Sequence, residues 1–442
     1  MGGRPAAPLY DSLKRLAARR PLRFDMPGHH GVLSPARLGE VALDFTETGC
    51  TGDLFGPGGD DIEAAEIMWA RRFGFDSCLF LTGGSTQGVH TGLALLAGAG
   101  SAVALDRGSH RSAYHALALL DLNPHYLLRP WLEREGVAGP IQPEGVAETL
   151  QNHPEIKTVC ITSPTYYGVL SDLPAIAKVC HAHGARLMVD GAHGAHLPFL
   201  GYEGYQAADV VVMSAHKTLP ALGQSALLFA NGLTLAQLRG MGSVYGSSSP
   251  SYLLLAGLDA ARAYMEREGA RRYGYTARRT ARLRSRFPAL RPESVALDPT
   301  RLTLACADGF ALARRLRAAG IFPEMADRGH VVFLLTCADG PRRLARLERV
   351  LEKLVDQGAE PYPCPAPPAP PQQVLTPRQA LFAPRKTLPL SQGEGQVSAG
   401  QLAPYPPGVP VVAPGELLEK KHLVYLREIG YNRSDTMVEV VS

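Results

Sequence analysis

Between about residues 75 and 230, short apolar runs alternate with helical segments, and this pattern restricts the fold more than any other feature. The apolar runs read SAVAL, KTVCIT, ARLMVD and DVVVMSA, and segments such as DLPAIAKVCHAHG separate them. Strands that are apolar on both faces need cover on both faces, which is typical of parallel sheets flanked by helices. The sequence therefore predicts an α/β fold with a mostly parallel central sheet.

The length of 442 residues exceeds what one hydrophobic core usually serves, and the pattern changes along the chain. A long helical stretch follows Tyr252, and the later segment EPYPCPAPPAPPQQ is too rich in proline for a helix or an interior strand. We predict an N-terminal helical segment over 1–21, a large α/β domain over 22–260, a small α/β domain over 261–358, a proline-rich linker over 359–373 and a C-terminal α+β domain over 374–442.

Composition narrows the class of protein. The net charge is only +4 and the basic residues are spread along the chain, so we expect neither nucleic acid nor a membrane surface as a partner. Seven cysteines without a C-x-x-C pair predict reduced thiols and a cytoplasmic protein. The first twenty residues contain no apolar signal segment. The fourteen histidines show no zinc-like spacing with cysteines or acids, so no metal site is expected.

The segment VVVMSAHKTLPAL carries Lys217 to the end of an apolar strand. Apolar surroundings lower the pKa of a lysine, and the neutral amine can then attack an aldehyde and form a Schiff base. The alternative is a structural lysine that extends its amine to the surface.

The segment LMVDGAHGAH favours the first interpretation, because its strand ends in Asp190. The carboxyl edge of a parallel sheet is where α/β folds bind ligands. A carboxylate beside the ring nitrogen of pyridoxal phosphate keeps that nitrogen protonated and makes the ring an electron sink. Read alone, Asp190 is an aspartate that caps a strand end. Together, Asp190 and Lys217 predict pyridoxal phosphate, and His193 and His196 are then explained by the cofactor.

The cofactor's phosphate needs hydrogen-bond donors, and LTGGSTQGVHTGLALLAGAG offers them. Gly83 and Gly84 permit a tight turn, Ser85 and Thr86 supply hydroxyl and N–H groups, and the following helix presents its positive end. The segment is not a nucleoside-triphosphate loop, and its alternative is an ordinary helix cap.

Two further strand ends carry polar side chains. His110 follows the strand SAVAL, where an imidazole can stack on the cofactor ring; the alternative is a loop histidine. Hydroxyl groups that can touch the cofactor or the substrate end the strand KTVCIT: Thr162, Ser163 and Thr165. For the next two residues, Tyr166 and Tyr167, simple packing is the alternative.

Taken together, these segments resemble the short-chain form of the bacterial Orn/Lys/Arg decarboxylases, which are fold-type-I pyridoxal-phosphate enzymes. The matching segments follow the family's order and cover nearly the whole chain. They read MPGHHG, TGGSTQG, DRGSHRSAYHAL, SPTYYGV, DGAHGAH, SAHKTLPAL, SSSPSYLLLAGLDAAR and PYPPGVPVVAPGE.

The resemblance implies a role for each candidate residue. Lys217 would form the Schiff base, Asp190 would pair with the pyridine nitrogen, His110 would stack on the ring and His193 would lie near it. These four are the implied catalytic residues. The implied phosphate ligands are Ser85, Thr86, Ser214 and His216, with help from residues 247–251 of a neighbouring subunit. The resemblance also implies a homodimer or a higher homo-oligomer.

Two departures concern the substrate. Gly191 follows Asp190 where the family usually has glutamate, and Gly400 ends VSAG where the family usually has an acidic residue. His30, in PGHH, is a milder change. A cationic substrate group needs an anionic partner, and the remaining candidates are Glu47, Asp53 and Asp61.

The predicted function is therefore decarboxylation of a basic amino acid to its amine and CO2, with arginine ahead of lysine and ornithine, for polyamine formation. One alternative is another fold-type-I reaction such as transamination. A second, motivated by Gly191 and Gly400, is a catalytically altered family member with a regulatory role.

Overall fold

A computed structural model describes residues 22–24, 30, 33, 52–404, 409–431 and 436–442. The predicted N-terminal helix over 1–21 and the candidate Glu47 lie outside these residues. None of the described helices is both long enough and apolar enough to span a bilayer.

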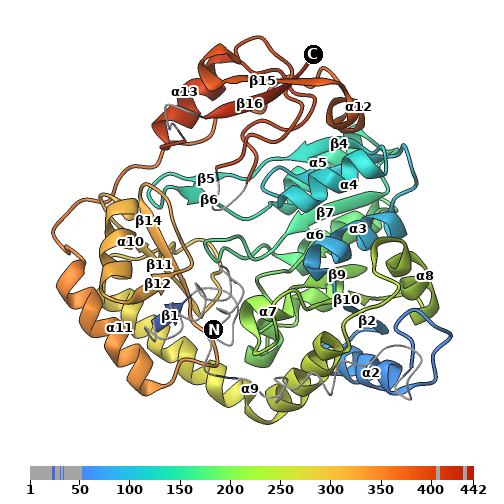
Figure 1. Cartoon of the computed structure of the whole chain (residues 1–442), viewed down its shortest axis with the longest axis horizontal. Coiled ribbons are helices and arrows are strands. Elements are labelled where there is room, and N and C mark those ends of the chain that lie inside the picture. Colours follow the sequence, from blue (N-terminus) through green and yellow to red (C-terminus); the bar gives the residue numbers. More distant parts are fainter. Residues whose placement is uncertain (1–21, 25–29, 31–32, 34–51, 405–408, 432–435) are drawn as a thin grey trace, which may run out of the picture.

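The centre of the molecule is a seven-stranded sheet (Figure 1). Its strands lie in the order β2 (Ser77–Leu81), β10 (Ala226–Ala230), β9 (Val210–Met213), β8 (Arg186–Asp190), β7 (Thr158–Thr162), β3 (Ala102–Asp106) and β4 (Asn123–Leu127). β10 runs antiparallel to β2 and β9, and the other neighbours are parallel. Most of these strands are buried on both faces, so the predicted α/β fold with a mostly parallel sheet is confirmed.

Helices flank this sheet. They are α2 (Asp61–Phe73), α3 (Gly84–Leu96), α4 (Arg111–Leu119), α5 (Pro143–Asn152), α6 (Leu173–Ala182), the short α7 (Ala215–Thr218) and α8 (Leu235–Tyr245), with 3-10 turns at Leu197–Leu200 and Gly204–Ala207. α3 lies unusually close to the sheet. A Cβ atom at Gly88 would be 2.6 Å from Val212, and one at Gly92 would be 2.7 Å from Met188. These glycines therefore allow α3 to pack closely on the sheet, and this packing sets the position of its first turn at the sheet edge.

A second, smaller unit follows the large one. It contains an antiparallel sheet of β11 (Arg301–Ala305), β14 (His330–Leu334) and β13 (Met325–Ala326), and a parallel pair of β1 (Leu22–Phe24) and β12 (Ile321–Pro323). Helices α10 (Gly309–Ala318) and α11 (Pro341–Leu354) pack on these strands. The long helical stretch predicted after Tyr252 is α9 (Tyr252–Arg286), which runs along both units (Figure 1).

The C-terminal part lies across the top of both units in Figure 1. It contains the antiparallel pair β15 (Arg385–Pro389) and β16 (Met437–Val441), helices α12 (Pro377–Phe382) and α13 (Lys420–Glu428), and a 3-10 turn at Leu390–Gln392. Its small core includes Leu402, Val412 and Val440. Beneath it, the large unit extends a hairpin of β5 (Trp131–Leu132) and β6 (Val137–Ala138).

The three hydrophobic cores correspond to the large, small and C-terminal units. Leu22 and Phe24 of β1 belong to the second core, and position 260 lies inside the continuous helix α9. We therefore propose the five-part division in a revised form, with Leu22–Phe24 in the small domain and the boundary near residue 260 within α9.

A buried ion pair joins the large and C-terminal units across 309 residues of sequence. The Arg107 guanidinium donates to the Glu416 carboxylate at 2.6 Å (Nη1 to Oε1) and 2.8 Å (Nη2 to Oε2). Arg107 also donates to the Val411 carbonyl at 3.0 Å, and Ala413 N donates to Glu416 at 2.7 Å. This bidentate geometry fixes the C-terminal unit against the loop that leads to His110.

Candidate active site

Six strands of the large sheet run in the same direction and end at one edge, and the sequence-predicted residues follow these ends. α3 starts after β2, His110 follows β3, Asp190 ends β8 and Lys217 follows β9. β10, the antiparallel strand, leads away from this edge. Since the carboxyl ends of parallel strands share one edge, the topology brings these residues together.

Lys217 and His193 form the centre of this group. Lys217 Nζ lies 3.1 Å from His193 Nε2, and Asp190 is buried close by with its carboxylate accepting a hydrogen bond from Ala192 N at 3.1 Å. Tyr166 packs its ring against His193 with centroids 4.5 Å apart. The amine of the half-buried Lys217, a buried imidazole and a buried carboxylate therefore meet within one small volume.

Burial controls the protonation of these groups. Burial lowers the pKa of Lys217, and this effect outweighs the charges of Asp190 and Glu324, which raise it. Burial also raises the pKa of Asp190, although the charge of Lys217 lowers it. Burial, followed by the charge of Lys217, lowers the pKa of His193 well below its usual range and that of His110 to about 4. Both imidazoles are therefore neutral near pH 7, and the amine is biased toward its nucleophilic form.

The first turn of α3 lies beside α7. Ser214 Oγ donates to Ser85 Oγ at 2.9 Å, while Thr86 is exposed. Gly84 adopts a φ of 70°, and the N-cap Gly83 has no side chain that could cap the first turn of α3, while Gln87 Oε1 accepts only from Gly83 N, at 2.9 Å. The N–H groups of this turn therefore remain for an anion. His216 turns its Nδ1 toward the Ser225 carbonyl at 2.9 Å.

His110 is the N-cap of α4, and its Nδ1 lies 2.9 Å from Ser112 Oγ, which fixes the ring. The hydroxyl groups that follow β7 are used within the protein: Ser163 Oγ accepts from Ser171 N and Thr165 Oγ1 accepts from Val169 N, both at 3.1 Å. Thr162 Oγ1 is buried and has no partner among the described residues. His196 bonds to Asp298 at 3.0 Å, so a partner in the polypeptide accounts for its position.

Two charged residues near the site were not predicted from the sequence. Glu324 accepts a hydrogen bond from the Tyr166 hydroxyl at 2.6 Å and acts electrostatically on Lys217. Arg301, whose side chain is only 1% exposed, donates to the Tyr166 carbonyl at 2.9 Å and acts on both Lys217 and His193. Both come from the small unit, more than eighty residues after Lys217, and no local pattern marks them. Tyr166 is thus more than a packing residue, since it links these groups.

The remaining residues that the sequence singled out for substrate binding have the following surroundings. Asp53 accepts from Phe55 N at 3.0 Å in a local turn, and Asp61 starts α2. Gly191 lies against Tyr205, where an added Cβ would be 3.2 Å from the ring. Gly400 lies in the C-terminal unit, and an added Cβ there would have Glu439 as its nearest neighbour, at 3.8 Å. His30 is buried and bonds to Asp339 at 3.1 Å.

These groups fit pyridoxal phosphate. His193 Nδ1 is buried without a partner among the described residues, and the buried Asp190 carboxylate suits a protonated ring nitrogen. The first turn of α3 and the Ser85 and Ser214 hydroxyls suit a phosphate, and Lys217 suits an aldehyde. Ser247, Ser248 and Ser249 are exposed in the single chain.

Comparisons with known proteins agree with this fit. The family model described as Orn/Lys/Arg decarboxylase, major domain, matches residues 7–300, and the C-terminal domain of the same family matches residues 366–433. Arginine decarboxylase from Bacillus subtilis is 29% identical over 95% of this chain and 92% of its own length. Arginine decarboxylase from Halalkalibacterium halodurans is also 29% identical, over 97% and 94%.

Among solved structures, the constitutive lysine decarboxylase of Escherichia coli superposes with a TM-score of 0.76 at 20% identity. The superposition covers 90% of this chain and 75% of that one, and it establishes a shared fold. With its fold, its site and both family domains in place, the chain belongs to the Orn/Lys/Arg decarboxylase family and is a fold-type-I decarboxylase that depends on pyridoxal phosphate.

Proposed function

We propose that this enzyme decarboxylates a basic amino acid, with arginine ahead of lysine and ornithine, and that the amine product serves polyamine formation. The preference for arginine is supported by relatives of similar length that carry the name arginine decarboxylase. We further propose the catalytic residues Lys217, His110, Asp190 and His193, and the phosphate ligands Ser85, Thr86, Ser214 and His216.

The 3.1 Å contact between Lys217 Nζ and His193 Nε2 carries this proposal. A neutral imidazole accepts a proton from the ammonium form of Lys217 and returns it to the amine, and burial lowers the pKa of both groups and so favours their neutral forms. The pair therefore holds a mobile proton at a defined atom, beside the carboxylate of Asp190.

Pyridoxal phosphate, when bound, supplies a protonated aromatic ring that accepts the electron pair left by the departing CO2. Asp190 would hold the proton on the ring nitrogen, His110 would shield the ring from water, and Lys217 would hold the cofactor's aldehyde. The Lys217 amine lies beside His193 and could deliver a proton to the substrate carbon that loses CO2.

For the cationic end of the substrate we propose Glu324. It contributes a half-buried carboxylate to the electrostatics of Lys217, and its hydrogen bond with Tyr166 fixes it on the side of His193. A guanidinium or ammonium group that reaches this carboxylate forms a charge-assisted hydrogen bond. Glu324 thus takes the role for which Gly191 and Gly400 have no side chain.

Replacing Lys217 tests the catalytic assignment. Lys217→Ala should lose the visible absorption of a lysine-bound cofactor and release no CO2 from arginine, lysine or ornithine. Lys178→Ala, at an exposed position on α6, is the matched control and should keep both signals. A Lys217→Ala protein that keeps the cofactor absorption would refute the assignment. Retained absorption in the parent without CO2 release from any of the three substrates would instead refute the proposed substrates.

We also propose a cytoplasmic homo-oligomer, with the exposed residues 247–249 facing a neighbouring subunit's cofactor phosphate. Sedimentation velocity should give at least a dimer. Ser248→Trp should weaken cofactor affinity without unfolding the chain, whereas a monomeric parent enzyme with full activity would contradict this arrangement.

A further inference from the structure

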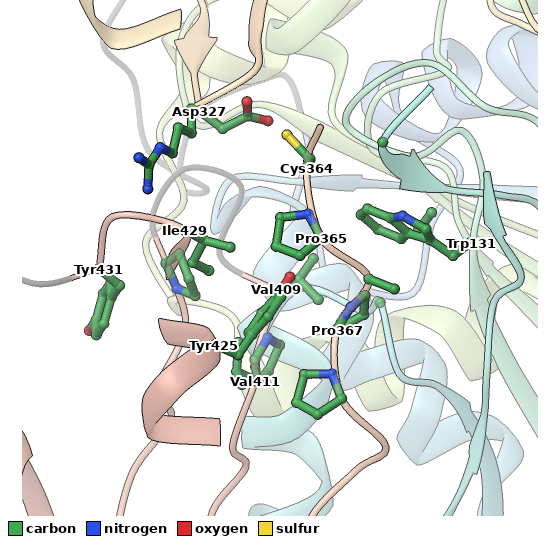
Figure 2. Close-up of a pocket in the computed structure, with 18 of the residues that line it drawn as sticks. Trp131, Asp327, Cys364, Pro365, Pro367, Val409, Val411, Tyr425, Ile429 and Tyr431 are labelled. Carbon is green, nitrogen blue, oxygen red and sulfur yellow. The ribbon is translucent and has the colours of Figure 1, made fainter. Parts of the chain in front are cut away.

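A cavity of about 640 Å³ lies where the C-terminal unit, the proline-rich linker, the small unit and the hairpin β5–β6 meet (Figure 2). At one end of it, the Asp327 carboxylate and the Cys364 sulfur point toward one another. Neither residue belongs to the proposed active site: Asp327 starts the turn before β14, and Cys364 lies in the linker.

A third group, His330, completes a cluster with Asp327 and Cys364. His330 Nδ1 lies 3.1 Å and 3.2 Å from the two Asp327 carboxylate oxygens and 3.9 Å from Cys364 Sγ. The three ligand atoms all lie within 4.8 Å of one another. In a tetrahedral zinc site, bonds of about 2.0 Å to nitrogen and about 2.3 Å to sulfur separate those two atoms by about 3.5 Å. His330 Nδ1 and Cys364 Sγ therefore need to approach one another by only a few tenths of an ångström.

The surrounding backbone makes room for the sulfur. A Cβ atom at Gly329 would lie 2.6 Å from Cys364 Sγ, and one at Gly136 would lie 3.0 Å from Cys364 Cβ. Any other residue at position 329 would push the thiol away from His330. The approach of the linker to this turn thus depends on glycine on both sides.

The hydrogen bonds around the cluster orient its ligands. His330 Nε2 donates to the Glu135 carbonyl at 2.9 Å, which leaves Nδ1 to face Asp327 and Cys364. Tyr167 donates to Asp327 Oδ2 at 2.5 Å, while Gly329 N and His330 N donate to Oδ1. Histidines and carboxylates that bind metals are commonly held in this way, with the second ring nitrogen donating to a backbone carbonyl.

We propose that Asp327, His330 and Cys364 bind a Zn²⁺-type divalent cation, which fastens the linker to the small unit and to the hairpin. Thiolate, imidazole and carboxylate are the ligands that zinc prefers, and the two anionic ligands balance its charge. Water from the cavity completes the tetrahedron. Zinc replaces two protons, one from the Cys364 thiol and one from His330 Nδ1, and both protons pass to solvent. The site is independent of the cofactor.

The sequence does not predict this site, because its three ligands show no zinc-like spacing. A competing cluster exists on the surface, where His125, His153 and Glu155 also bring their ligand atoms within 4.8 Å of one another. Those groups are more exposed and come without a cysteine, so they should bind a cation more weakly and without protecting a thiol. The experiment must therefore distinguish the two clusters.

The test titrates the holoenzyme, stripped of metal, with Zn²⁺ in competition with a chromogenic chelator. We expect one site per chain whose affinity falls at least roughly 100-fold in Cys364→Ser and in His330→Gln. Cys306→Ser, a half-buried thiol near the same turn, and His153→Ala, at the surface cluster, are matched controls and should stay within about threefold. Zn²⁺ should also slow alkylation of Cys364 more than roughly tenfold, while leaving Cys306 unprotected. Unchanged cofactor absorption shows that each variant is folded.

Three binding results would overturn the proposal. They are the absence of stoichiometric binding by the parent holoenzyme, a site that survives in both Cys364→Ser and His330→Gln, and a site that His153→Ala abolishes. Equal alkylation of Cys364 with and without bound Zn²⁺ would exclude the thiol as a ligand and would also overturn it.

Discussion

The ion pair between Arg107 and Glu416 allows the attachment of the C-terminal unit to be measured. Arg107→Met keeps most of the aliphatic side chain and removes the guanidinium, which makes two hydrogen bonds to Glu416. The Glu416 side chain is only 1% exposed, and it would keep the hydrogen bond from Ala413 N alone. Removing one partner of a buried ion pair costs about 3–5 kcal/mol, because the other charge stays buried without compensation.

The double variant Arg107→Met/Glu416→Gln should recover much of this loss. Glutamine keeps an acceptor for Ala413 N and brings no charge, so only about 1–2 kcal/mol should remain missing. An exposed pair serves as the control: Arg385 lies 2.8 Å from Glu439, with side chains 37% and 50% exposed. Arg385→Met should therefore cost less than about 1 kcal/mol.

Native-state hydrogen exchange measures the effect where it arises. A loss of about 3 kcal/mol should speed the exchange of buried amides over residues 409–431 roughly 100-fold in Arg107→Met, with a much smaller change in the central sheet. An Arg107→Met protein within about 1 kcal/mol of the parent would refute the reasoning. So would a double variant whose loss equals the sum of the two single losses, since the charges would then act independently.

Three further predictions follow from the site and its support. Glu324→Gln should raise KM for arginine about 10- to 100-fold with a smaller change in kcat, because a charge-assisted hydrogen bond contributes about 1.5–3 kcal/mol. Steady-state kinetics measure both constants. Glu203→Gln, at an exposed position, is the control and should change neither constant. Gly88→Ala should lower the free energy of unfolding by about 1–3 kcal/mol in urea titrations, because its Cβ would lie 2.6 Å from Val212. Gly98→Ala is the control and should not destabilise the protein, because an added Cβ there has no atom within 4 Å. Since burial lowers the pKa of His110 to about 4, its ring resonances in cofactor-free protein should remain those of neutral imidazole down to about pH 5, and a titration near pH 6.5 would contradict this.

Sequence patterns alone are sufficient to identify the residues that end the central strands. A run such as VVVM, apolar at every position, has to lie inside a covered sheet, so Lys217 and Asp190 had to emerge at its edge. The tight turn of TGGSTQG before α3 was equally readable, because glycines and a helix start are local features. These local signals were sufficient to predict the fold class, the cofactor and the family, and all three are confirmed.

The groups that surround those residues come from distant segments, and the packing of whole units brings them there. Glu324 and Arg301 reach the site because the small unit folds back along α9, and Arg107 meets Glu416 across 309 residues. The cluster of Asp327, His330 and Cys364 likewise forms because the linker passes over a turn that glycine keeps open. Periodicity and turn residues report the conformation of neighbouring residues, whereas these contacts depend on how whole units pack, which no short segment of the sequence encodes.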